Sequence, residues 1–406
     1  MTLRTVGTGA RLGAVLLALC AAVPAAAGQS VRIGILTDMS GTYADMGGAG
    51  SVAAARLAID DCLAAECKGM TIELLSADHQ NKADIGAQKA REWADVNKVN
   101  AMADLTNSAV ALGVQKLAVE HNFVAMYSGP ATTKLTNEDC TPNGFHWMFD
   151  TYALAAGSAQ AITRMGGKSW YFITVDYAFG HSLEADSMAM VKAAGGTVVG
   201  SIRHPLGISD MSSFLLSAQS SSAQVIALAN GGGDTINAIK TAREFGVVQS
   251  GKQVVPLLIF LSDIRSLGLE TAQGLTFTEG FYWDQDEAAR AFAARFQQAF
   301  QNRKPTMVQA GTYSSVLHYL RAVAAAKTTE AKLVAAKMRE LPIRDAVMHN
   351  PAIRADGRVI HDMLLVKVKS PAESKGEWDF YSVLATIPAA QAFQPLEKSA
   401  CPLIKN

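Results

Sequence analysis

The sequence predicts an α/β protein of two doubly wound, Rossmann-like lobes, each a parallel sheet covered by helices. From Val31 onward, short apolar segments of strand length alternate with longer segments whose apolar residues recur at helical spacing. Such alternation is typical of parallel sheets, because each right-handed crossover lays its helix on the sheet. The alternation starts afresh after Tyr152, and a chain of 406 residues is too long for one ordinary hydrophobic core.

The first half of the chain supplies four strands and three helices. Val31 to Leu36 is the first strand, and a glycine-rich loop from Ser40 to Gly50 joins it to the first helix. The pattern then predicts helices at 51–63, 85–96 and 110–120 and further strands at 71–76, 101–105 and 123–127.

The second half repeats this order. Helices are predicted at 154–164, 183–194, 214–218 and 235–245, and strands at 170–174, 198–203, 225–229 and 257–261. An extended stretch at 275–283 could lead the chain back to the first lobe. After it come helices at 288–301, 307–326 and 332–340 and strands at 359–368 and 378–385.

Residues 1–27 are typical of a cleavable export signal. Arg4 and Arg11 precede or open an apolar run from Leu12 to Val23, and the segment ends in three alanines at Ala27. A run of twelve residues is shorter than the roughly 20 that a membrane-spanning helix needs. We therefore expect cleavage after Ala27 and a mature chain that works in the periplasm.

The composition after cleavage excludes some classes of partner. The mature chain carries 34 basic and 36 acidic side chains, so its net charge of about −2 gives no electrostatic case for nucleic acid. No later apolar run reaches spanning length, and we expect no membrane insertion of the mature chain.

Four cysteines remain after cleavage. An even count in an oxidising compartment favours disulfides, although four cysteines allow three pairings. The short separation between Cys62 and Cys67 favours one small loop and leaves Cys140 with Cys401. Because no Cys-x-x-Cys pair or clustered histidine accompanies them, we expect no metal. The only close glycine fingerprint lies within the signal segment, and we expect no nucleotide or other cofactor.

Loops that follow strands are the places to look for a ligand, because parallel sheets bind ligands beyond their C-terminal strand ends. Hydroxyls and free N–H groups just before a helix can accept a carboxylate without a formal positive charge. For any single loop, capping and turn formation explain such residues. A cleft is nevertheless predicted, because five loops on facing lobes are rich in small polar and aromatic residues, namely 38–43, 106–108, 128–132, 176–181 and 230–234.

The sequence motifs typical of enzymes are mostly absent or incomplete. The segment from Gly180 to Glu184 resembles a nucleophile elbow but lacks its final glycine, and the histidines are dispersed without metal-ligand spacing. We expect a protein that is not an enzyme.

Several segments resemble the substrate-binding proteins of branched-chain amino acid type ABC importers, the type I periplasmic binding proteins. The segments that carry the resemblance are 33–43, 77–81, 128–131 with 135–136, 176–180 and 311–315. The resemblance implies two lobes joined by three crossover strands, near 149–152, 275–281 and 356–361. It places residues 28–151 and 279–356 in the N-terminal lobe, and residues 152–278 and 357–406 in the C-terminal lobe.

The resemblance also implies a ligand site. The loops 106–108 and 128–132 would hold a ligand carboxylate, and the opposite lobe would add an aromatic ring, Tyr177 or Phe179. Amino-acid binders of this family use an acidic side chain for the ammonium group, and Asp263 lies near that position but is shorter than the expected glutamate. The predicted ligand-binding residues are Tyr43, Asn107, Ser108, Ser128, Gly129, Pro130, Ala131, Thr132, Tyr152, Tyr177, Phe179, Asn230, Asp263 and Tyr282.

The function implied is that of a solute receptor that closes by hinge motion and hands its ligand to the permease subunits of an ABC importer. The short Asp263 and the aromatic loops favour a small carboxylate with an aromatic or branched apolar body. A sensor that regulates an amide or nutrient response is the alternative, and an exported α/β enzyme is an alternative from a different class.

Overall fold

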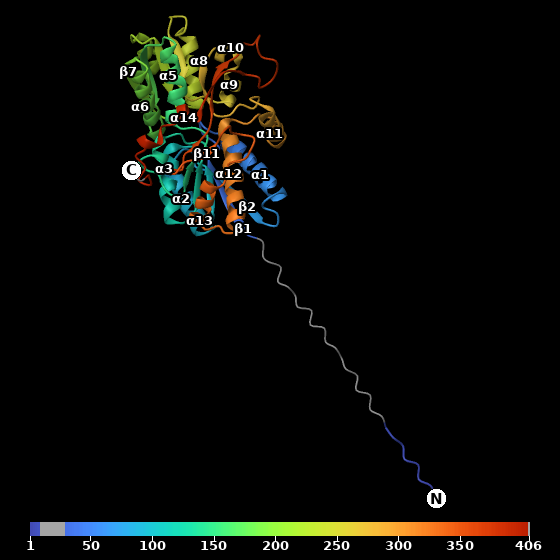
Figure 1. Cartoon of the computed structure of the whole chain (residues 1–406). Coiled ribbons are helices and arrows are strands. Elements are labelled where there is room, and N and C mark those ends of the chain that lie inside the picture. Colours follow the sequence, from blue (N-terminus) through green and yellow to red (C-terminus); the bar gives the residue numbers. More distant parts are fainter. Residues whose placement is uncertain (9–28, 405–406) are drawn as a thin grey trace.

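In the computed structural model, the chain folds into two lobes, which lie one above the other in Figure 1. The structure describes residues 1–8 and 29–404. Most of the signal segment predicted at residues 1–27 therefore lies outside the described residues. Within them, no helix has the length and apolar character needed to cross a membrane.

The first lobe is built on a five-stranded parallel sheet of order β2-β1-β3-β4-β5. Its strands β3 and β4 are buried throughout, as expected for strands covered on both faces. The sequence did not predict β5, whose three residues pair with β4. The strands are β1 (Ser30–Thr37), β2 (Thr71–Asp78), β3 (Ala101–Asp104), β4 (Val124–Tyr127) and β5 (Gly144–His146).

Helices from both ends of the chain cover this sheet. The helix α12 lies beside α1, although about 250 residues separate these two helices in sequence. It also contacts β3. Thr306 and Gln309 cap each other at the start of α12. The Thr306 hydroxyl accepts from the N–H of Gln309, and the Gln309 side chain accepts from the N–H of Thr306. The helices of this lobe are α1 (Gly48–Ala64), α2 (Ala83–Asp95), α3 (Ser108–Glu120), α12 (Met307–Ala326) and α13 (Ala331–Glu340), with α11 (Glu287–Ala299) against α1.

The second lobe is built on a four-stranded parallel sheet of order β7-β6-β8-β9. Its central strand β8 is fully buried. The strands are β6 (Ser169–Val175), β7 (Thr197–His204), β8 (Val225–Ala229) and β9 (Gln253–Pro256). Its helices include α6 (Ala178–Ala193), α7 (Ser212–Ser220), α8 (Gly233–Glu244), α9 (Leu261–Leu267) and α10 (Leu269–Ala272).

The strand predicted at 257–261 is wrong. The strand β9 ends at Pro256, which pairs with Leu228 near the end of β8, so residues further along have no neighbouring strand to pair with. The apolar run continues as buried backbone and then enters α9 at Leu261. Burial alone gave this segment its strand-like pattern.

Two further predicted elements are divided in the structure. The helix predicted at 154–164 begins at Thr151 and contains a π-helical turn, so it is described as α4 (Thr151–Leu154), η2 (Ala155–Ala159) and α5 (Gln160–Arg164). The strand predicted at 359–368 is β12 (Val359–Ile360) followed by β13 (Met363–Val368).

A third sheet lies beside the second lobe. It is antiparallel and has the order β10-β13-β14, with β10 (Thr276–Glu279) and β14 (Tyr381–Ile387), while β12 pairs with β11 (Ala352–Ile353). Side chains such as Phe277, Val366 and Tyr381 pack in one core with Ile226 and Leu228 of the second parallel sheet. The remaining short helices are η1 (Thr133–Thr136), α14 (Ala389–Ala392) and η3 (Leu396–Lys398).

Two of the crossover segments are bonded to each other between the lobes. Arg358 is fully buried, and its Nη1 donates a hydrogen bond of 3.0 Å to the carbonyl of Phe149. The guanidinium Nε lies 3.4 Å from the carboxylate of Asp150. The ring of His361 bonds the carbonyl of Met148 at 2.6 Å. These contacts hold the segments 148–150 and 358–361 side by side.

Both predicted disulfides are confirmed. Cys62 pairs with Cys67 and Cys140 with Cys401, with Cα atoms 5.0 and 5.5 Å apart. The second bond ties the end of the chain to the loop between β4 and β5 of the first lobe.

Candidate functional site

The lobes meet where the loops at the C-terminal ends of their strands face one another. The hydroxyls of Tyr43 and Tyr177 are 2.9 Å apart, within hydrogen-bond distance. Beside them, the backbone N–H of Gly233 donates to the carbonyl of Thr42 at 3.2 Å. Further along, the hydroxyls of Thr133 and Ser182 lie 3.2 Å apart. These contacts join loops of the first lobe to α6 and α8 of the second.

A small cavity lies at this junction, and we call it the interlobe cavity. Its free volume is about 10 Å³, roughly the space that one water needs. The first lobe contributes six of its lining residues and the second lobe three. None of these nine carries a formal charge, and they are Tyr43, Met46, Thr106, Ser108, Gly129, Ala131, Tyr177, Phe179 and Leu258.

The carboxylate of Asp38 holds Tyr43 in place. It accepts hydrogen bonds from the backbone N–H groups of Gly41 at 2.7 Å and of Tyr43 at 2.9 Å. The side-chain amide of Asn81 donates to the same carboxylate. The loop after β1 is thereby folded back so that the Tyr43 ring faces the second lobe.

The first-lobe side of the cavity is tightly packed around Gly129. A Cβ atom at this position would lie 2.7 Å from Cα of Thr106 and 2.8 Å from a carboxylate oxygen of Asp104. Only glycine lets the two loops approach this closely. The Thr106 hydroxyl donates to Asp104 at 2.9 Å. The Ser108 hydroxyl, at the start of α3, accepts from the N–H groups of Ala131 and Thr132, both at 3.3 Å.

The second-lobe side presents two aromatic rings at the start of α6. The ring centroids of Tyr177 and Phe179 are 6.0 Å apart. A Cβ at Gly180 would lie 2.0 Å from the carbonyl oxygen of Val175, so glycine lets this turn press against the end of β6. Burial raises the pKa of Tyr43 and of Tyr177, which keeps both hydroxyls neutral and able to donate or accept.

Six of the fourteen predicted ligand-binding residues line the interlobe cavity: Tyr43, Ser108, Gly129, Ala131, Tyr177 and Phe179. Three others serve the surrounding structure. The Asn107 side chain caps α3 by accepting from Ala109 at 2.9 Å and Val110 at 3.2 Å. The carbonyl of Pro130 bonds the His146 ring, and the Asn230 amide bonds His204.

The other five lie around or away from the cavity. The hydroxyls of Ser128 and Thr132 are buried and have no hydrogen-bond partner within the described residues. Tyr152 is half-buried on α4. Tyr282 packs on Tyr381 with ring centroids 4.9 Å apart, inside the core of the second lobe. The Asp263 carboxylate accepts from the N–H of Phe260 at 3.0 Å and caps its own helix, α9.

Sequence reasoning missed three lining residues, which are Met46, Thr106 and Leu258. Thr106 belongs to the polar loop 106–108, which the sequence already places directly after a predicted strand. Leu258 lies inside the apolar run that was predicted as a strand. Met46 had no signal, because only the fold of the 38–47 loop brings it to the cavity.

Four buried acids lie near the lobe junction without lining the cavity. Burial raises the pKa of Asp104 and of Asp234 to about 6, of Asp263 to about 7 and of Glu279 to about 8. Glu279 ends the crossover strand β10, and its carboxylate accepts from the N–H of Gly280 at 3.1 Å. Within residues 29–404, no group of three or more His, Cys, Asp or Glu is placed to hold a metal ion.

Glu279 should make the stability depend on pH. Its pKa is raised from 4.5 to about 8, so the folded protein favours the protonated form and loses stability as the pH rises between these values. We expect Glu279→Gln to remove this loss, so that its free energy of unfolding relative to the parent improves by about 3 to 4 kcal/mol between pH 5 and pH 8. Urea unfolding at both pH values measures the change. The prediction would be contradicted if the difference in free energy of unfolding between variant and parent were the same at pH 5 and at pH 8.

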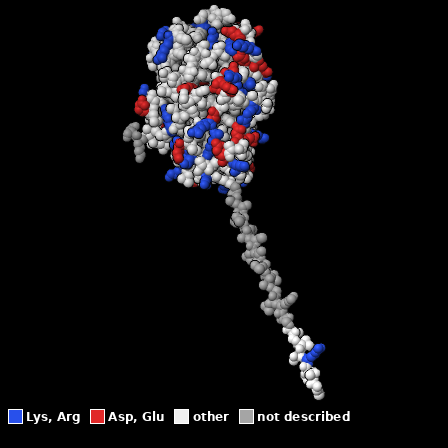
Figure 2. Space-filling view, turned by 45° about the vertical axis from the view of Figure 1, so that its right-hand side comes forward, with Lys and Arg blue, Asp and Glu red and all other residues white. Residues whose placement is uncertain are grey.

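Charge is mixed over the outside of the molecule. The whole chain has 36 basic and 36 acidic side chains, and on the face shown in Figure 2 the two kinds are interspersed.

The fold and the interlobe cavity together define a two-lobed ligand-binding protein.

The chain belongs to the periplasmic binding protein family, whose model matches residues 30–377. It is similar to a periplasmic binding protein from Burkholderia mallei, with 48% identity over 93% of this chain and 100% of that one and a TM-score of 0.89. It is also similar to a branched-chain amino acid ABC transporter periplasmic ligand-binding protein from Burkholderia xenovorans, with 38% identity over 92% and 99% of the chains and a TM-score of 0.81.

A more distant structure shares the fold. It is a solute-binding protein of an ABC transporter from Rhodopseudomonas palustris in complex with 3,4-dihydroxybenzoic acid, with 20% identity over 89% and 98% of the chains and a TM-score of 0.79. A comparison with curated proteins gave no significant match.

Proposed function

We propose that this protein is the extracytoplasmic solute-binding component of an ABC importer and that it captures a small carboxylate with an aromatic or branched apolar body. One observation carries the proposal. The interlobe cavity combines uncharged hydrogen-bonding groups on the first lobe with aromatic rings on the second, and no charged side chain lines it among the residues described.

The first-lobe groups suit a carboxylate. Ser108 is the first residue of α3, a helix of 13 residues whose N-terminus carries a partial positive charge, and Asn107 already caps the N–H groups of Ala109 and Val110 there. The Ser108 hydroxyl accepts from two backbone N–H groups and donates to no described residue, so its proton is available to an anion. Hydrogen bonds to an anion are stronger than those between neutral groups, so such donors can hold a carboxylate without a cation.

The surroundings disfavour a ligand with an ammonium group. Asp104 is engaged by the Thr106 hydroxyl beneath the cavity, and Asp263 accepts from its own helix turn. Neither carboxyl lines the cavity, so neither is placed to pair with an ammonium group bound there. An ammonium buried without a partner is costly. The cavity therefore favours an acid without an amine.

The relatives support the importer role and show that the fold can hold an aromatic acid. The Burkholderia xenovorans relative is described as a branched-chain amino acid transporter protein, which supports the importer role. Structures of the same fold from Rhodopseudomonas palustris hold 4-hydroxybenzoate and benzoate, so the fold accommodates aromatic acids.

We assign residues 28–151 and 279–356 to the N-terminal lobe and residues 152–278 and 357–406 to the C-terminal lobe. The packing of α12 on α1 supports the first assignment, and the packing of β13 and β14 with the second parallel sheet supports the other. A ligand larger than water needs the Tyr43–Tyr177 contact to open and close again around it. Periplasmic binding proteins are a known case of such hinge closure. The mature protein would act in the periplasm and pass its ligand to permease subunits.

A thermal-shift comparison tests the ligand class. We expect benzoate and 4-hydroxybenzoate to raise the melting temperature, because a ligand that binds only the folded state stabilises it. Benzyl alcohol, which lacks the carboxylate, and phenylalanine, which adds an amine, should have a much smaller effect. A rise with phenylalanine or leucine alone would contradict the exclusion of an ammonium group. Product formation from the bound acid would indicate the enzyme alternative.

A further inference from the structure

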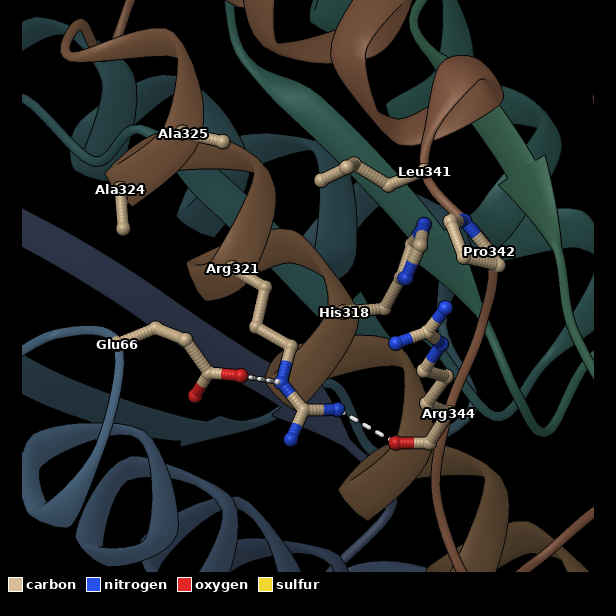
Figure 3. Close-up of a pocket in the computed structure, with 8 residues that line it drawn as sticks. All are labelled: Glu66, His318, Arg321, Ala324, Ala325, Leu341, Pro342 and Arg344. Atoms are coloured by element: carbon tan, nitrogen blue, oxygen red, sulfur yellow. Dashed lines mark hydrogen bonds and ion pairs between the residues drawn. The ribbon is translucent and has the colours of Figure 1, made fainter.

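A second and larger hollow lies in the first lobe, away from the interlobe cavity. Its volume is about 490 Å³, within the range of small-molecule sites. Residues of the C-terminal half of α12, the Cys62–Cys67 loop and the segment after α13 form its walls (Figure 3). We call it the α12 pocket.

The α12 pocket and the interlobe cavity lie at opposite ends of one helix. At the start of α12, the Thr306 hydroxyl donates to the carbonyl of Met46, which lines the interlobe cavity. His318 and Arg321 of the α12 pocket come 12 and 15 residues later. At 1.5 Å per residue, this separation is about 18 Å or more along the helix. A ligand in one site cannot reach the other.

Two arginines give the α12 pocket a positive charge that is only partly neutralised. The Nε of Arg321 lies 3.0 Å from the Glu66 carboxylate, and its Nη1 donates to the backbone carbonyl of Arg344. The guanidinium of Arg344 has no ion pair or side-chain hydrogen bond to any described residue. Figure 3 shows it beside the His318 ring, on the pocket side of the segment after α13.

His318 does not change this balance. Its Nε2 lies 2.9 Å from the carbonyl of Met338, so that nitrogen carries the proton and donates. Burial lowers the pKa of His318 and keeps the ring neutral. Among the eight residues that line the pocket, one carboxylate and two guanidinium groups therefore leave one positive charge.

The rest of the pocket wall is apolar. Ala324 and Ala325 stand on the last turns of α12, and Leu341 and Pro342 face them across the hollow (Figure 3). Methyl and ring carbons of this kind suit a hydrocarbon body, which gains from leaving water. A fully hydrated inorganic anion would make no use of them.

We propose that the α12 pocket binds a monocarboxylate whose apolar body lies along Ala324, Ala325 and Leu341 and whose carboxylate pairs with Arg344. The guanidinium fork of Arg344 matches the two oxygens of a carboxylate. This site is separate from the ligand site proposed above and does not depend on it.

Calorimetric titration with hexanoate tests the site on the full mature chain, with 1-hexanol as the uncharged probe of the same body. We expect hexanoate to bind Tyr177→Ala, in which the interlobe cavity is disabled, and the affinity to fall at least about tenfold when Arg344→Gln is added. Arg290→Gln, which removes a surface arginine paired with Asp284, is the matched control and should bind like the parent.

Each other outcome overturns the proposal. Equal binding of hexanol would show that the carboxylate is not recognised, and equal affinity in Arg344→Gln would place the ligand elsewhere. Loss of all hexanoate binding in Tyr177→Ala would assign it to the interlobe cavity. Benzoate binding to Arg344→Gln, measured in parallel, reports on the interlobe site alone, so the two proposals can fail separately.

Discussion

Tyr177→Ala is expected to weaken binding of the acid found in the thermal-shift comparison by about thirtyfold to a hundredfold. The Tyr177 ring forms one wall of the interlobe cavity, and its hydroxyl contacts Tyr43 of the opposite lobe. Aromatic anchors in such positions typically contribute 2 kcal/mol or more, and each 1.4 kcal/mol is tenfold in affinity. Calorimetric titration of parent and variant measures the change.

A matched aromatic deletion separates binding from stability. Phe214 is also half-buried in the second lobe, where it packs against His204 outside the interlobe cavity. We expect Phe214→Ala to lower the melting temperature and to leave the affinity within about twofold of the parent, well under 1.4 kcal/mol. If both variants keep the parent's affinity, the ligand does not occupy the interlobe cavity.

Asp150→Ala is expected to lower the free energy of unfolding by about 3–5 kcal/mol. Asp150 is the ion-pair partner of Arg358, which is fully buried at the crossovers. Removing it leaves an uncompensated charge in the protein interior, and breaking a buried pair in this way is costly. Arg358 would keep its hydrogen bond to the Phe149 carbonyl, which offsets part of the cost. Urea unfolding measures the difference.

Asp286→Ala provides the control for this variant. Like Asp150, Asp286 caps a helix, accepting from Ala289 at 2.7 Å where Asp150 accepts from Ala153 at 2.8 Å. Its ionic partner, His349, is exposed. We expect a loss of about 1 kcal/mol, the usual value of a cap. Equal losses in the two variants would mean that the Asp150–Arg358 pair contributes nothing beyond helix capping.

The fold could be predicted in most respects because its periodicity is strong. The helix predicted at 307–326 has the same bounds as α12, and the strand predicted at 225–229 coincides with β8. The prediction fails where pairing with a neighbouring strand, and not the apolar pattern of the segment itself, decides the structure. The strand β5 has only three residues and depends on β4, while the run at 257–260 is apolar but passes beyond its neighbour.

The candidate site was predictable at the level of loops more than of side chains. Tyr43, Ser108 and Gly129 follow strands directly, so topology places them at the junction. Tyr282 also follows a crossover strand, yet it turns into the core beside Tyr381. Whether an aromatic side chain faces the cleft or the core depends on packing between distant segments, which periodicity does not encode.

The bond between Cys140 and Cys401 encloses almost two thirds of the chain in one covalent ring. All three segments that pass between the lobes lie within this ring. A protease that cuts any one of them therefore produces two fragments that stay attached. On a denaturing gel the nicked protein should run as a single species until a reductant is added, so an intact band without reductant does not show that the crossovers are uncut.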